Sequence, residues 1–194
     1  MKYISKKELM EIINRLDNAQ DKFIVLGIYS GLMRCSNADL LNLKVSDVDF
    51  KNKTINVNGM SIAFDEELEK IIKESITQQR YYKLGEQGRS NEYYLLNISS
   101  PYIIKSRPLP SNKYGSESMT VDSLKQRLIR LSSFLGVNGM NTRLLKQSGA
   151  FNLLKEENKE WTLDAATQFL NEKGFNLRRN NILAMIKELR KNVV

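Results

Sequence analysis

Apolar residues recur every three or four positions along most of the sequence, which is the spacing that places them on one face of a helix. Residues 45–64 are different, because strand-favouring residues alternate there and Asn-Lys and Asn-Gly pairs favour turns. The strand-favouring residues are Val48, Phe50, Ile55 and Val57. This segment predicts either a β-hairpin or a three-stranded meander. We therefore expect a fold that is mainly α with a small antiparallel β-sheet, in the α+β class.

Capping residues set some of the expected helix ends. Ser5 and Glu8 have the spacing of a capping box, and Asp65 is a typical N-cap residue. The predicted helices cover residues 5–16, 21–29, 37–43, 65–76, 120–135, 141–157, 162–173 and 180–191. All three prolines lie within residues 83–118, where residues 93–96 favour one short strand.

The charge of the chain is distributed unevenly. The formal net charge is +8, and residues 98–194 hold 16 Lys and Arg against 8 Asp and Glu. The whole excess therefore lies in the second half, as a surface facing a polyanion requires. Because Cys35 is the single cysteine and the chain has no histidine, we expect no disulfide, metal or cofactor. The apolar runs are too short for a membrane span, and we expect a cytoplasmic protein with no membrane partner.

Two regions of the sequence carry a resemblance. The first comprises residues 30–32 (Ser-Gly-Leu), 39–43 (Asp-Leu-Leu-Asn-Leu) and 46–50 (Ser-Asp-Val-Asp-Phe). In this order and at this spacing they resemble the first signature of the tyrosine recombinase (phage integrase) catalytic domain. The segment Asn141–Leu154 is similar to the second signature, with Arg143 in the place of a histidine and Lys146 in the place of an arginine.

The resemblance covers nearly the whole chain. It implies one catalytic-type domain over residues 1–194, without the N-terminal core-binding domain of the family. It also implies a chemistry in which a tyrosine hydroxyl attacks a DNA phosphodiester. Arginine, lysine and His or Trp side chains then stabilise the developing charge, and no metal is required.

Several residues that this chemistry needs are missing. The last tyrosine is Tyr114, whereas the family spacing places the nucleophile at residues 180–182, which are Asn, Asn and Ile. Met33 follows the Ser-Gly-Leu motif where an arginine belongs, and Arg34 follows it as though displaced by an insertion. Met60 stands in the place of the hairpin lysine. We therefore expect a catalytically inactive member of the family.

Cationic residues can still bind DNA phosphates without a nucleophile. Arg143 and Lys146 lie three residues apart and so share a helix face, in the region where the family binds the scissile phosphate. The predicted DNA-binding residues are Arg34, Lys125, Arg143, Lys146, Arg178 and Arg179. The alternative for each is a solvated surface charge. The tyrosine pairs at residues 81–82 and 93–94 are interpreted as packing residues, with base stacking as the alternative.

Three functions follow as hypotheses. The first is a non-catalytic protein that binds double-stranded DNA, such as a transcriptional repressor of a phage or mobile element. The second is an active site-specific recombinase whose nucleophile lies elsewhere. The third is a protein-interaction module that antagonises a recombinase or a repressor. The amphipathic segment Ile182–Val194 allows homo-oligomerisation through the C-terminal helix, or ordinary packing within the chain.

Overall fold

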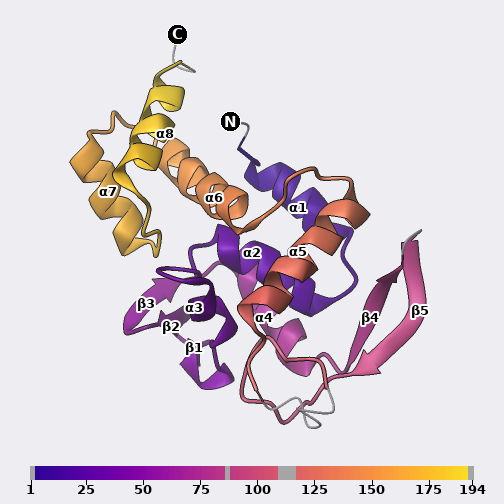
Figure 1. The fold of residues 1–194 in the computed structure, drawn as a ribbon. Helices are drawn as coiled ribbons and strands as arrows, with labels where there is room; N and C mark the ends of the chain where they lie inside the picture. The colour runs from indigo at the N-terminus through magenta and orange to yellow at the C-terminus, as the bar shows by residue number, and fades with distance from the viewer. Residues whose placement is uncertain (1–2, 86–87, 109–116, 192–194) are drawn as a thin grey trace.

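The computed structural model describes residues 3–85, 88–108 and 117–191 (Figure 1). Its helices are α1 (Lys6–Asn14), α2 (Ala19–Tyr29), α3 (Asn37–Leu41), α4 (Glu66–Thr77), α5 (Val121–Leu135), α6 (Thr142–Glu156), α7 (Leu163–Glu172) and α8 (Arg179–Lys191), with a short 3-10 helix at Val45–Asp47. Its strands are β1 (Val48–Asp49), β2 (Thr54–Val57), β3 (Met60–Ala63), β4 (Arg80–Gly85) and β5 (Gly88–Leu95). The expected mainly α fold with small antiparallel sheets is confirmed. The ends of α1, α2 and α3 differ by about two residues from those predicted, as the fraying of helix ends allows.

Strands β1, β2 and β3 form an antiparallel meander, which is one of the two predicted arrangements. Ile55 lies opposite Val48 on one side and Ile62 on the other, and it is fully buried. The turn between β2 and β3 places Asn58 and Gly59 at φ of 50° and 78°. Two consecutive positive φ values are what a two-residue hairpin turn of type I′ requires, and Asn-Gly adopts them readily.

The strand predicted at residues 93–96 is present as the end of β5, but β5 begins at Gly88 and pairs with β4, which was not predicted. Tyr81 pairs with Tyr94 and Tyr82 with Tyr93, and the register shifts between Tyr82 and Leu84. This shift interrupts the alternation of inward and outward side chains by which a strand at β4 could have been predicted. Tyr81 is buried and Tyr94 half-buried, as expected for packing residues, whereas Tyr82 and Tyr93 are exposed.

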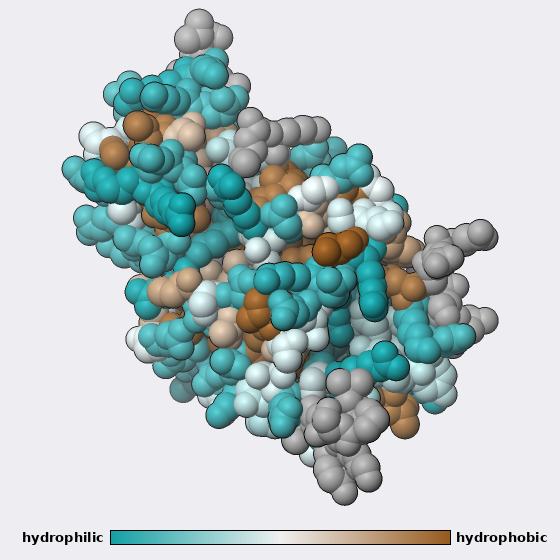
Figure 2. Space-filling view, viewed as in Figure 1, coloured by the Kyte–Doolittle hydropathy of each residue, from teal (hydrophilic) through white to brown (hydrophobic). Residues whose placement is uncertain are grey.

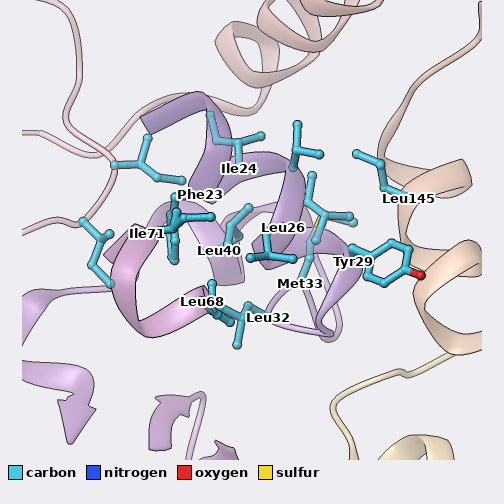
Figure 3. Packing of buried hydrophobic residues seen from close by; sticks show 14 of the residues in the cluster. Phe23, Ile24, Leu26, Tyr29, Leu32, Met33, Leu40, Leu68, Ile71 and Leu145 are labelled. Atoms are coloured by element: carbon cyan, nitrogen blue, oxygen red, sulfur yellow. The ribbon is translucent and has the colours of Figure 1, made fainter. Parts of the chain in front are cut away.

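Helix α2 lies at the centre of the main hydrophobic core (Figure 3). From Phe23 onward its sequence is apolar on all sides, and ten of its eleven residues are buried. Phe23, Ile24 and Leu26 project from it, and Ile71 of α4 and Leu145 of α6 belong to the same core. A helix that is apolar all round is stable only when other elements cover every side, as here.

A second core joins α7 and α8 to the C-terminal half of α6. These elements form one end of the molecule, and the β4–β5 hairpin extends at the other (Figure 1). Figure 2 shows a mostly hydrophilic surface on the face in view, with hydrophobic residues in small separate patches. Within the described residues, no helix has the length and apolarity needed to cross a membrane.

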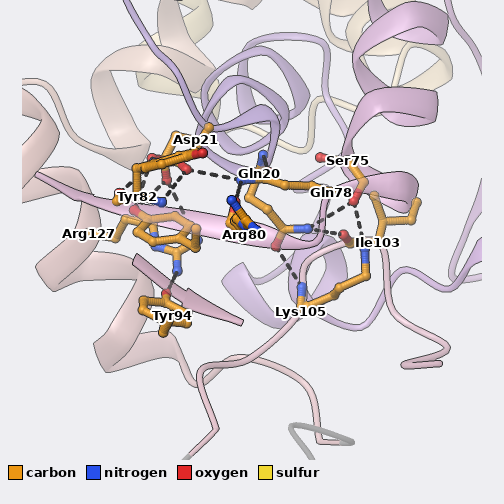
Figure 4. Close-up of polar contacts among 12 residues, drawn as sticks. Gln20, Asp21, Ser75, Gln78, Arg80, Tyr82, Tyr94, Ile103, Lys105 and Arg127 are labelled. Carbon is orange, nitrogen blue, oxygen red and sulfur yellow. Dashed lines mark hydrogen bonds and ion pairs between the residues drawn. The ribbon is translucent and has the colours of Figure 1, made fainter. Parts of the chain in front are cut away.

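A buried lysine ties the segment after the hairpin to α4. Lys105 is 1% exposed, and its Nζ donates hydrogen bonds to the carbonyl oxygens of Ser75 and Ile76 at 2.7 and 2.6 Å (Figure 4). The backbone N–H of Lys105 also donates to Gln20 Oε1 at 2.8 Å. An ammonium group near the last carbonyls of a helix is favourable. Burial nevertheless lowers the pKa of Lys105 from 10.5 to about 8.

This lowered pKa predicts a pH dependence of stability. Between about pH 8 and 10.5 the unfolded chain binds more protons at Lys105 than the folded one, so the free energy of unfolding should rise with pH over that window. In Lys105→Met this contribution is absent. Between pH 7 and 9.5, the unfolding free energy of the unsubstituted protein should rise by about 1–2 kcal/mol relative to that of Lys105→Met. Urea denaturation at the two pH values measures this difference. A constant difference would contradict the prediction.

Candidate nucleic-acid interface

The turn between α2 and α3 brings Arg34 to α6. Lys146 Nζ donates a hydrogen bond to the carbonyl oxygen of Arg34 at 2.6 Å. Lys146 is 9% exposed, whereas Arg34 is half-exposed. The two predicted residues therefore lie side by side although 112 positions separate them.

Asp39 fixes the shape of this turn. Its Oδ2 accepts hydrogen bonds from the backbone N–H groups of Cys35 and Ser36, and its Oδ1 accepts from Ser36 Oγ at 3.0 Å and Asn58 Nδ2 at 2.7 Å. Burial acts against the charged carboxylate, but the hydrogen bonds from Ser36 and Cys35 outweigh it and lower the pKa of Asp39. The carboxylate thus stays ionised and organises the turn that presents Arg34.

Burial lowers the pKa of Lys146. Its neighbours Cys35 and Asp39 act in the opposite direction and favour the ammonium form. A partly desolvated cation beside the half-exposed Arg34 has the chemistry of an anion site, because a phosphate that enters it meets little competing water.

The segment between α7 and α8 also reaches this turn. Asn176 Nδ2 lies 3.7 Å from Cys35 Sγ. Gly31 and Gly174 both have positive φ, and their backbones touch. A Cβ atom on Gly31 would lie 2.5 Å from the carbonyl oxygen of Lys173, and one on Gly174 would lie 2.7 Å from the carbonyl oxygen of Gly31. Only glycine at both positions permits this approach.

The other predicted cations have different surroundings. Arg143 and Arg178 are exposed and have no carboxylate partner among the residues with described positions. Arg179 binds Asp164 of α7 at 2.8 Å, and Lys125 binds Asp122 within α5 at 3.3 Å. The structure thus joins Arg34 to Lys146, whereas Lys125 and Arg179 are engaged with carboxylates. Their roles in DNA binding stay predictions.

The predicted DNA-binding residues did not include Asp39 or Asn176, which the structure places at this turn. A signal for Asp39 was present, because Ser36 and Asp39 have the spacing of a capping box, and the structure forms that box. No local pattern predicts the contact of Asn176 with Cys35, since the two residues are 141 positions apart.

The position expected for the nucleophile falls at the start of α8. Asn180 is exposed, Asn181 is half-buried, and Ile182 is buried in the second core. The apolar residues Met185 and Ile186 of α8 are also buried within the same chain, which agrees with the packing alternative for this helix. Tyr114, the last tyrosine, lies outside the described residues.

The helices and the three-stranded meander described above, in their order along the chain, form the tyrosine recombinase catalytic fold. The structure is similar to that of the XerH site-specific recombinase bound to a palindromic difH substrate, with a TM-score of 0.60 and 16% identity over 99% of this chain and 51% of that one. It is also similar to the Tn1549 transposon integrase in complex with circular intermediate DNA, with a TM-score of 0.56 and 15% identity over 94% of this chain and 64% of that one. Residues 3–192 match the family described as "MrpR, C-terminal catalytic domain", and the chain belongs to this family.

A curated relative comes from a prophage. The chain is 24% identical, over 192 residues, to the SPbeta prophage-derived uncharacterized protein YopR of Bacillus subtilis strain 168. The match covers 91% of this chain and 56% of YopR. The chain thus spans between about half and two thirds of the length of these relatives. The predicted resemblance to tyrosine recombinases is confirmed.

Proposed function

We propose that this domain binds double-stranded DNA without cutting it. We further propose that the protein is a transcriptional regulator, most simply a repressor, of a phage or mobile element. The observation that carries the proposal is the hydrogen bond from Lys146 Nζ to the backbone carbonyl oxygen of Arg34, which brings the two residues together, while Asn180, Asn181 and Ile182 occupy the nucleophile region. The phosphate-binding part of the fold is kept, and the attacking hydroxyl is not.

Two further findings support DNA as the partner. The solved structures of XerH and of the Tn1549 integrase that share this fold are complexes with DNA. Arg143 and Arg178 add exposed positive charge on the two elements, α6 and the α7–α8 connection, that meet at the Arg34 turn. The prophage origin of YopR supports the assignment to a phage or mobile element.

The test is binding to a duplex selected from a random library, followed by gel shifts between 50 and 200 mM salt. We expect the logarithm of the affinity to fall linearly with the logarithm of the salt concentration. Arg34→Ala, Arg143→Ala and Arg178→Ala should each reduce the slope by about 1, because each removes one phosphate contact. Lys125→Ala and Arg179→Ala should have smaller effects, since carboxylates already neutralise these side chains.

Lys70→Ala is the control, because Lys70 lies on α4 and pairs weakly with Glu74 at 4.0 Å. It should leave the salt slope unchanged. No binding to any duplex at low salt would exclude the DNA-binding proposal.

A nicked suicide substrate separates binding from catalysis. We expect no covalent complex, and a trapped phosphotyrosyl adduct would establish an active recombinase instead.

A further inference from the structure

A cavity of about 660 Å³ lies between α5, the β4–β5 hairpin and the segments at residues 106–107 and 117–120. Its volume is within the range of pockets that hold small molecules. None of its lining residues belongs to the Arg34 and Lys146 site. It therefore needs an explanation separate from DNA binding at that site.

Positive charge predominates among the side chains that line this cavity. Arg107, Arg127, Arg130 and Lys83 are the basic residues, and Glu117 and Asp122 are the acidic ones. Lys83 is bound to Glu92 and Asp122 to Lys125, so both are engaged outside the cavity lining. Arg107 and Arg130 are exposed, and neither has a carboxylate partner in the part of the chain that the structure describes.

Arg127 lies deepest, with its side chain 10% exposed. It extends between Asp21 and Tyr94, and its Nη2 donates a hydrogen bond to Tyr94 Oη at 3.3 Å (Figure 4). Its Nη1 lies 3.6 Å from Asp21 Oδ1 and has no hydrogen-bond partner among the described residues. This buried nitrogen faces Asp21, and the Arg127 side chain adds positive charge to the lining of the cavity.

The cavity also has a flat aromatic wall. The rings of Tyr81 and Tyr94 stack at 4.9 Å between centroids, and the guanidinium of Arg107 lies 5.4 Å from the centre of the Tyr94 ring. Met119 and Leu84 add apolar surface, and the hydroxyls of Thr120 and Ser123 lie at the start of α5. Arginine beside an aromatic face can bind a phosphate and a planar ring at the same time.

We propose that this cavity binds a small phosphate-bearing molecule of nucleotide size. Arg107 and Arg130 bind the phosphate, and the planar ring lies against the apolar surface of Leu84 and Met119. A DNA backbone carries the same phosphate chemistry, but the cavity is walled by the hairpin on one side and α5 on the other, with a buried arginine at its base. These features fit a discrete small molecule better than a continuous strand.

The test is isothermal titration of the protein with each of the four ribonucleoside 5′-monophosphates and with inorganic phosphate. We expect at least one nucleotide to bind with a Kd on the order of 10–100 µM, as is usual for a ligand of this size, and tighter than inorganic phosphate. Arg107→Ala and Arg130→Ala should each weaken this binding at least about fivefold. Ser123→Glu should abolish it by placing a carboxylate in the cavity, at a helix position where glutamate is well tolerated.

Arg80→Ala is the matched control. Arg80 also covers a tyrosine, at 4.7 Å from the Tyr93 ring centre, but it does not line the cavity. It should leave nucleotide affinity unchanged. No nucleotide binding tighter than about 1 mM, or equal affinities for nucleotides and inorganic phosphate, would overturn the proposal.

The same variants distinguish the cavity from the DNA site. If Arg107→Ala and Arg130→Ala weaken only duplex binding and no mononucleotide binds, the cavity contacts DNA and the nucleotide proposal is wrong. Because the nucleotide titration contains no DNA, its result does not depend on whether the domain binds a duplex. Melting curves followed by circular dichroism should show that all of these surface variants are folded.

Discussion

Gly149→Ala should destabilise the protein by at least about 3 kcal/mol, at the upper end of the range for overpacked sites. A Cβ atom at Gly149 would lie 1.8 Å from the carbonyl oxygen of Tyr29 and 2.8 Å from its carbonyl carbon. The obstacle is the backbone of α2, which cannot rotate away as a side chain would. Helix α6 must therefore move off α2, and core contacts such as those around Leu145 open with it.

Thermal unfolding followed by circular dichroism measures this effect. For a chain of this size, a loss of about 3 kcal/mol lowers Tm by roughly 6–12 °C. Gly27→Ala is the control, because it also lies within a helix and gains the same helix propensity. Its nearest neighbour is the end of the Leu40 side chain at 2.9 Å, which can adjust. Equal Tm values for the two variants would contradict the argument from backbone contact.

Arg127→Met should cost about 3–5 kcal/mol near neutral pH, because it leaves the carboxylate of Asp21 buried without its cation. Asp21 is 1% exposed, and its other partners are Tyr81 Oη at 3.0–3.1 Å and Asn18 Nδ2 at 3.2 Å. Methionine fills a similar volume but supplies neither charge nor hydrogen bond.

The cost of Arg127→Met should depend on pH. Burial raises the pKa of Asp21, against the opposing effects of Arg127, Tyr81 and Asn18, so removing Arg127 raises it further. The folded protein then binds a proton at Asp21 more readily than the unfolded chain does. Its stability therefore falls as pH rises from about 4 through the folded pKa. We expect a smaller loss at pH 5 than at pH 8 by urea denaturation.

The double variant Asp21→Asn with Arg127→Met tests the cause of that loss. It removes the buried charge along with its partner, so most of the stability should return and the pH dependence should disappear. If the double variant were as unstable as the single one, lost packing around Arg127, and not an uncompensated carboxylate, would explain the effect.

Local sequence patterns predicted the parts of the fold that depend on neighbouring residues. The Asn-Gly turn, the capping box at Ser5 and the apolar run of α2 all specify their own conformations. The β4–β5 hairpin was predicted only in part, as a strand at residues 93–96, because its inner face is defined by contact with α5, about 30 positions later in the chain. Its exposed residues resemble an ordinary polar loop.

The candidate site was only partly predictable for the same reason. The motif spacing identified Arg34 and Lys146, because their places in the family pattern are set within short segments. The ion pair of Asp21 with Arg127 and the burial of Lys105 depend on partners 29 to 106 positions away. A periodic pattern shows that a residue is polar, but not that the folded chain encloses it.

The contact between Gly31 and Gly174 has a consequence for control of the domain from its C-terminal end. Residues 173–178 connect α7 to α8. The backbone of this connection packs against Gly31, and the Asn176 side chain contacts Cys35, in the turn that carries Arg34. A protein that displaced α8 would carry this connection with it and withdraw the support beneath the turn. If the domain binds DNA as proposed, such an inhibitor would weaken phosphate binding at the turn without contacting Arg34 or Lys146.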